Sequence, residues 1–123
     1  MQHINRLATH FAAAALALVL GATAATAHSF LDHASPRVGS TVKTSPSEVR
    51  LWFTQPLEPQ FSGAILRSST GVELGHGTVN GADAKQIVIH VHGLPAGKYH
   101  VTWKALSVDT HRTQGSFNFE IKP

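Results

Sequence analysis

The chain contains no cysteine and a single methionine, Met1. Without cysteine the protein has no disulfides of the kind common in small secreted domains, no thiolate metal site and no cysteine nucleophile. Met1 lies in a segment that we expect to be removed, so a thioether site for a soft metal ion is excluded as well. Burial of apolar side chains must therefore stabilise the fold by itself.

Charged residues are also scarce, at 14% of the chain, and the ten Lys and Arg only slightly outnumber the seven Asp and Glu. The basic residues are spread along the sequence, with no basic run and no interleaved aromatic residues. That distribution does not indicate a nucleic-acid partner. Histidine is the unusual residue, because seven of the nine histidines lie after position 27.

The first 27 residues have the pattern of a secretory signal peptide: Arg6 near the start, an apolar run from Phe11 to Leu20, and small residues ending in Ala27. An uncleaved membrane anchor is the alternative, but the apolar run is shorter than the roughly 20 residues that span a bilayer. We therefore expect cleavage after Ala27 and no stable membrane insertion afterwards. Residues 28–123, which are the 123 residues less these 27, then form a single domain.

Short runs of alternating apolar and polar residues predict β-strands in this domain. In one of them, Val49, Leu51 and Phe53 share a face that we expect to be buried. The expected strands are residues 29–33, 49–53, 63–67, a strand from 72, 87–92, 99–105 and 117–121. About seven short strands without a convincing helix predict an all-β fold, an antiparallel Greek-key β-sandwich or barrel.

Glycine and proline divide these strands. The glycine-rich residues 75–77 and 80–81 are expected to form turns or loops. Pro56 and Pro59 exclude a central strand between them, because proline has no N–H for the hydrogen-bond ladder. We expect a loop or a sheet crossover there.

Asp109 and His111 are two residues apart, so on an extended strand their side chains would point to the same face and could reach one ion. Cleavage after Ala27 would make His28 the first residue, whose α-amine and Nδ1 can chelate one metal ion. Three nitrogens and a carboxylate oxygen suit Cu(II), which prefers tetragonal N,O coordination. The sequence thus predicts one Cu(II) per mature chain, bound by His28, Asp109 and His111.

The other histidines carry weaker signals. His90 and His92 share a strand face, and we expect them to face solvent, with a weak second metal site as the alternative. His33 is expected at a strand end on the surface, with a role as an outer ligand or hydrogen-bond partner as the alternative. His76 is expected in a loop and His100 on an exposed strand face.

The most specific motif of the mature chain is Ser107-Val-Asp-Thr-His111 followed by Gly115-Ser-Phe117, combined with a histidine at position 28. Together with several other segments, it resembles the CopC family of periplasmic copper-resistance proteins. The resemblance also includes His28-Ser-Phe-Leu31, Leu51-Trp-Phe-Thr-Gln-Pro56, Phe61-Ser-Gly-Ala64 and Leu94-Pro-Ala-Gly-Lys-Tyr99. It extends over essentially all of residues 28–123.

The resemblance implies a cupredoxin-like or immunoglobulin-like β-domain in the periplasm, with His28, Asp109 and His111 as Cu(II) ligands. It also implies a copper-transporting partner of the CopD type in the inner membrane. Many members carry a glutamate where Gln55 stands here, so we expect Gln55 to donate a hydrogen bond near the metal or to hold a water. The chain lacks the methionine-rich Cu(I) loop of some members and resembles the Cu(II)-only branch.

Two other functions fit parts of the sequence. An N-terminal histidine with a second histidine is also the copper site of lytic polysaccharide monooxygenases. A mature chain of this length leaves little room for a flat polysaccharide platform, and Asp109 would fill a position that oxygen chemistry needs open. The other alternative is a β-sandwich that only binds proteins. We expect a monomeric copper-binding protein without enzymatic activity.

Overall fold

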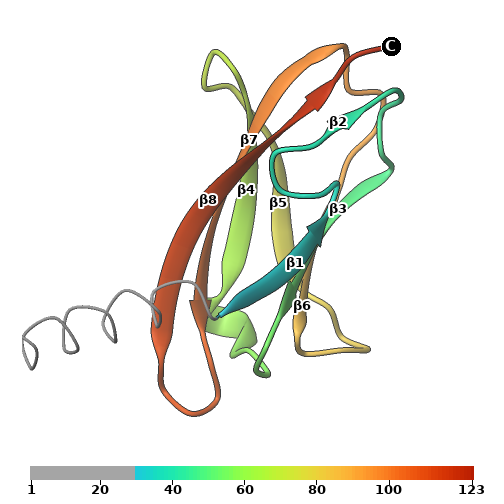
Figure 1. The fold of residues 1–123 in the computed structure, drawn as a ribbon. Coiled ribbons are helices and arrows are strands. Elements are labelled where there is room, and N and C mark those ends of the chain that lie inside the picture. Colours follow the sequence, from blue (N-terminus) through green and yellow to red (C-terminus); the bar gives the residue numbers. More distant parts are fainter. Residues whose placement is uncertain (1–29) are drawn as a thin grey trace, which may run out of the picture.

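The computed structural model describes residues 30–123, which consist largely of β-strands (Figure 1). The elements are β1 Leu31–Ser35, β2 Thr41–Val42, β3 Glu48–Phe53, the 3-10 helix η1 Pro59–Phe61, β4 Gly63–Ser68, β5 Glu73–Val79, β6 Gln86–His90, β7 Gly97–Leu106 and β8 Arg112–Ile121. They confirm the predicted all-β class, with eight strands in place of about seven. Within residues 30–123, no helix is long and apolar enough to cross a membrane. The expected signal, residues 1–27, and His28 lie outside the described residues.

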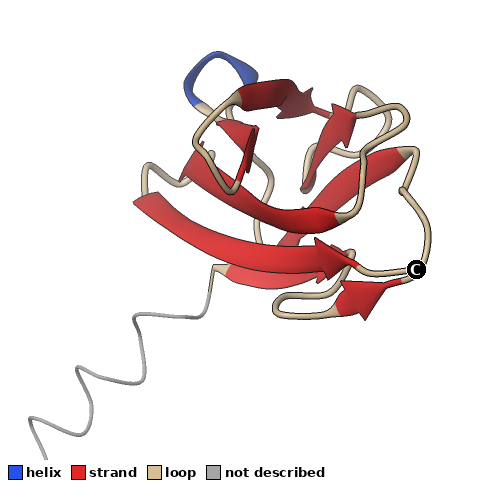
Figure 2. Cartoon of the chain, turned by 90° about the horizontal axis from the view of Figure 1, so that it is seen from above, coloured by secondary structure: helices blue, strands red, loops and turns tan. Residues whose placement is uncertain are grey.

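The eight strands form one sheet in the order β1-β3-β6-β5-β4-β7-β8-β2. The sheet curls around a core (Figure 2). The neighbouring sets β3-β6-β5-β4 and β7-β4-β5-β6 are both Greek keys, as predicted. All paired strands run antiparallel except β2 and β8, where Thr41 and Val42 pair in parallel with Glu120 and Ile121. The sheet is therefore mixed at this edge. The two-residue strand β2 is too short to produce a sequence alternation, which is why it was not predicted.

The predicted alternation places the core. On β3, Val49 and Leu51 are fully buried and Phe53 is nearly so, while the residues between them are only half-buried. On the hairpin of β7 and β8, the rings of Tyr99 and Phe119 stack with their centroids 5.4 Å apart. The buried cluster comprises Ala34, Val49, Leu51, Phe53, Leu57, Ala64, Leu66, Ile87, Ile89, Tyr99, Val101, Ala105, Phe117, Phe119 and Ile121.

Several strand boundaries differ from the predictions. β6 ends at His90 and not at residue 92, and β8 begins at Arg112 and not at residue 117. The first strand runs to Ser35 and buries Ala34, instead of ending at residue 33. Residues 75–77, expected to be a turn or loop, lie inside β5. A Cβ on Gly77 would come within 2.7 Å of Ile89 and 2.8 Å of Ile87, so glycine is required there by the packing of β6 side chains. The sequence suggested a turn because glycine occurs both in turns and at strand positions where another backbone or side chain approaches closely.

A side chain also packs closely against the backbone of Gly115, and we expect Gly115→Ala to destabilise the protein. The added Cβ would lie 2.6 Å from Trp103 Cζ2, and the Trp103 ring is held edge-on against Phe53 with a centroid distance of 5.2 Å. Overpacking of this kind lowers the free energy of unfolding by about 1–3 kcal/mol. Urea unfolding measures it. The control is Gly81→Ala, where nothing lies within 4 Å of the added Cβ. Equal stability of the two variants would contradict the prediction.

Candidate metal centre

The hairpin of β7 and β8 positions Asp109 and His111. The two strands have ten residues each and pair from Gly97↔Ile121 to Leu106↔Arg112. Residues 107–111, called the 107–111 loop below, close the hairpin at one end of the barrel (Figure 1). Because this long pairing is regular, the loop is attached to a rigid support.

The 107–111 loop is a tight turn and not the extended strand that the sequence suggested for Asp109 and His111. The Ser107 N–H donates to the His111 carbonyl at 3.0 Å, and the Thr110 N–H donates to the Ser107 carbonyl at 2.9 Å. Thr110 has a φ of 75°, in the left-handed region, which reverses the chain. The expectation of an extended backbone is thus wrong, although the turn still brings the two side chains together.

Asp109 and His111 form a close, solvent-facing pair. Asp109 Oδ1 lies 3.2 Å from His111 Nδ1, and the side chains are 49% and 78% exposed. The Ser107 hydroxyl donates to the same Oδ1 and is the main reason that the pKa of Asp109 lies below its ordinary value. Desolvation opposes this shift, and the backbone N–H and ring of His111 add to it. Asp109 is therefore ionised at neutral pH and can bind a cation.

The described chain begins at the end of the barrel that carries this loop, and residues 54–56 connect the two. The Thr54 N–H donates to the carbonyl of Phe30, the first described residue, at 3.0 Å. Two residues further along, the Pro56 carbonyl accepts a hydrogen bond from the Val108 N–H at 3.1 Å. The start of β1 and the 107–111 loop lie at the same end of the barrel (Figure 1). Gln55, the residue between these two contacts, is exposed at this end.

The comparison with known proteins decides the family. Residues 31–122 match the sequence profile of the CopC domain. The chain belongs to the CopC family. Copper resistance protein C of Escherichia coli is 36% identical over 115 residues, which cover 85% of this chain and 90% of that protein. Copper resistance protein C of Pseudomonas syringae pv. tomato is 35% identical over 127 residues, covering 97% of this chain and 98% of that protein.

The fold agrees with this assignment. The crystal structure of CopC from Methylosinus trichosporium OB3b superimposes with a TM-score of 0.71 at 31% sequence identity. The match covers 78% of this chain and 95% of that one. The curled eight-stranded sheet is thus the CopC fold, and the 107–111 loop belongs to that fold's β7–β8 hairpin.

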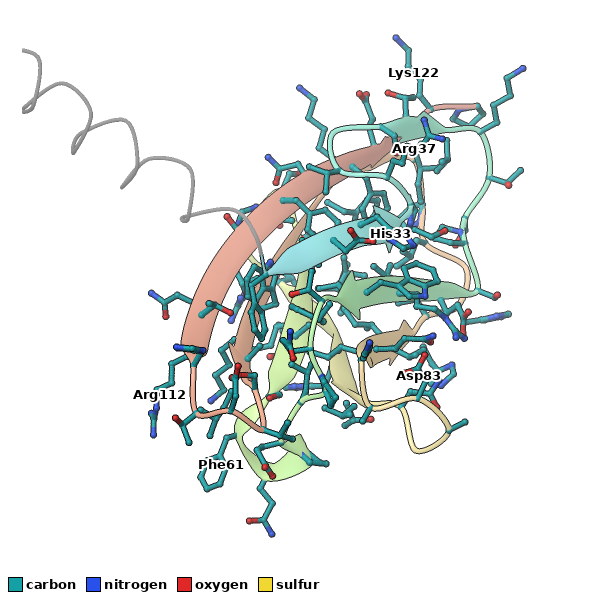
Figure 3. All side chains as sticks on the ribbon, turned by 60° about the horizontal axis from the view of Figure 1, so that its bottom comes forward. His33, Arg37, Phe61, Asp83, Arg112 and Lys122 are labelled. Carbon is teal, nitrogen blue, oxygen red and sulfur yellow. The ribbon has the colours of Figure 1, made fainter. Side chains whose placement is uncertain are left out.

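The remaining histidines of this CopC domain do not gather into a second site. Within residues 30–123, no three or more His, Asp or Glu side chains are close enough together to hold a metal ion. The His33 ring stacks on Trp52, with centroids 4.4 Å apart, and its Nδ1 lies 2.6 Å from Asp32 Oδ2. Figure 3 shows His33 well apart from Arg112, the residue after the 107–111 loop. His90 and His92 are exposed, as predicted.

Residues 54–58 have a structural role in the CopC domain that the sequence did not predict. They form an irregular segment, as the prolines indicated, but the segment also supports the 107–111 loop. Leu57 is 2% exposed and pairs with Ser107 in an isolated antiparallel bridge. The Glu58 N–H donates to the Leu106 carbonyl at 2.8 Å. The one sequence feature that could have indicated this role is Leu57, an apolar residue between Pro56 and Pro59.

Proposed function

We propose that the mature protein, beginning at His28, binds one Cu(II) in the periplasm and buffers or carries copper for resistance and homeostasis. The ligands are the amine and imidazole of His28, the carboxylate of Asp109 and the imidazole of His111. The observation that carries this proposal is the paired Asp109 and His111 beside the start of the described chain. The names of the relatives, copper resistance proteins, support copper as the cargo.

His28 is close in sequence to the first described residue, which supports the proposed role of its amine and imidazole. His28 precedes Phe30 by two residues, and an extended chain advances about 3.3–3.6 Å per residue. Phe30 and the 107–111 loop are joined through residues 54–56 by the hydrogen bonds to Thr54 and from Val108. We propose that His28 joins Asp109 and His111 from this end of the barrel.

The donor set fits Cu(II). Three neutral nitrogens and one carboxylate oxygen supply the N,O coordination that Cu(II) prefers, and they leave a net charge of +1 on the site. Gln55 adds no charge, whereas a glutamate there would bring the site to zero. The chain contains neither cysteine nor, after Met1, methionine for a softer metal. The same ligands bind Cu(II) without providing a catalytic step, because Asp109 occupies a coordination position.

The exposure of the ligands suits transfer of copper to a partner. His111 is 78% and Asp109 49% exposed, so an incoming protein can replace the ligands one at a time. We propose that a CopD-type copper transporter in the inner membrane receives or supplies the ion and that the protein acts as a monomer. Resistance and supply differ only in the direction of that exchange.

An EPR titration of the protein that begins at His28 tests the copper site. We expect one tetragonal Cu(II) signal with nitrogen hyperfine structure, which saturates at one equivalent because residues 30–123 hold no cluster of three or more His, Asp or Glu side chains that could form a second site. A purification tag must not precede His28 or add histidines. A mixed signal that keeps growing beyond one equivalent would show dispersed binding by surface histidines and contradict the proposal.

A further inference from the structure

Ser107 has an unusual position among the polar residues of the structure. It is 1% exposed, and it is the one buried polar or charged residue within residues 30–123. A buried hydroxyl costs free energy unless it is hydrogen-bonded. The Ser107 backbone pairs with that of Leu57, a buried residue. Ser107 is thus fixed at the end of β7. The Ser107 hydroxyl therefore has a fixed position from which it can form hydrogen bonds to neighbouring groups.

The hydrogen bonds of Ser107 go to both candidate ligands. Its hydroxyl donates to Asp109 Oδ1 and accepts from the His111 backbone N–H at 3.2 Å. Its own backbone N–H donates to the His111 carbonyl at 3.0 Å. The hydroxyl also lies 3.3 Å from the His111 carbonyl, but it has one hydrogen to donate, and the carboxylate is the closer acceptor.

The contact with Asp109 occupies only one carboxylate oxygen. Oδ1 accepts from Ser107 and lies beside the His111 ring, whereas Oδ2 has no hydrogen-bond partner among residues 30–123. A carboxylate held through one oxygen presents the other in a fixed direction. Without the hydroxyl, the half-exposed Asp109 side chain would sample several rotamers and would lose that freedom on binding the metal, which weakens binding.

We propose that Ser107 is a positioning residue of the copper site, whose buried hydroxyl holds the Asp109 carboxylate and the His111 backbone in the binding arrangement before the metal arrives. This inference rests on the proposed copper function. Ser107 does not touch the ion. It acts through Asp109, as the outer-shell partners of metal ligands commonly do.

Ser107→Ala tests the inference by removing the hydroxyl with little change of volume. The Kd for Cu(II), measured by competition with a chelator, should rise about 10–100-fold, the usual effect of losing an outer-shell partner. In a protein that already carries Asp109→Ala, adding Ser107→Ala should cause a smaller loss than it does in the unsubstituted protein, because Asp109, one of the two groups that Ser107 holds, is gone. Losses that simply add would overturn the inference, and so would an unchanged Kd for Ser107→Ala alone.

Ser62→Ala is the matched control. The Ser62 hydroxyl accepts a hydrogen bond from the Leu106 N–H at 3.0 Å, so it also supports the end of β7, but it contacts neither Asp109 nor His111. We expect this variant to lose stability and keep its copper affinity. If Ser62→Ala weakened copper binding as much as Ser107→Ala, general loosening of β7 would explain both results and the inference would fail.

Two further measurements keep the outcomes separate. If Ser107→Ala does not fold, two other variants replace it, Ser107→Thr and Ser107→Val. They differ only in that threonine has a hydroxyl where valine has a methyl group. Only the threonine variant should bind copper tightly. The unsubstituted protein reports on the proposed function itself. Tight single-site binding there together with no effect at Ser107 would reject the positioning role alone, whereas no tight binding in the unsubstituted protein would reject the copper function.

Discussion

A protein with one extra residue before His28 is expected to bind Cu(II) at least about 100-fold more weakly than the protein that begins at His28. The extra residue converts the α-amine into an amide, which removes one nitrogen ligand and the chelate ring that it closes with the imidazole. A ligand tethered to another binds from a high effective concentration, and such linkage is worth roughly 100- to 10,000-fold in affinity. Competition titration against a chelator measures the difference.

Two controls identify the cause of that loss. One extra alanine after Pro123 changes the length equally and should leave the affinity unchanged. His28→Ala in the protein that begins at residue 28 keeps the amine and removes the imidazole, so it should also weaken binding strongly. Equal Cu(II) affinities with and without the preceding residue would show that the N-terminal amine is not a ligand.

His111→Ala is expected to weaken Cu(II) binding by about 100-fold or more and to reduce the nitrogen hyperfine structure in the EPR spectrum. Loss of a direct ligand should exceed the 10–100-fold effect of an outer-shell partner. His111 is 78% exposed, so its removal should change the free energy of unfolding by less than about 0.5 kcal/mol. The affinity change can therefore be assigned to the lost ligand and not to the fold.

The matched control replaces two other imidazoles. His90 and His92 are exposed and have the same two-residue spacing as Asp109 and His111, but no metal-binding cluster includes them within residues 30–123. The double variant His90→Ala, His92→Ala should bind copper like the unsubstituted protein. If it lost as much affinity as His111→Ala, copper binding would be spread over surface histidines.

The strand predictions succeeded where a side-chain pattern repeats along the chain. Val49, Leu51 and Phe53 alternate because one face of β3 contacts the core, and that contact leaves a period of two in the sequence. The prediction missed β2, which has two residues and no period to detect. It also placed residues 75–77 in a turn, since the sequence does not show that isoleucines of β6 pack against the Gly77 backbone.

The proximity of Asp109 and His111 could be predicted from the sequence, but their local geometry could not. Asp109 and His111 are neighbours along the chain, so their proximity was expected, but the left-handed Thr110 that turns them together was not. The burial of Ser107 was not visible in the sequence either. It depends on Leu57, which is 50 residues earlier in the chain and packs beneath the loop.

The sequence alone determined the all-β class, the absence of thiol and thioether ligands, the candidate ligands His28, Asp109 and His111, and the resemblance to the CopC family. These properties follow from residue identity and short-range periodicity. The tertiary structure decided that residues 54–56 connect Phe30 with the 107–111 loop and that Ser107 holds Asp109. Such contacts join residues far apart in the chain, and only the pairing of the strands brings them together.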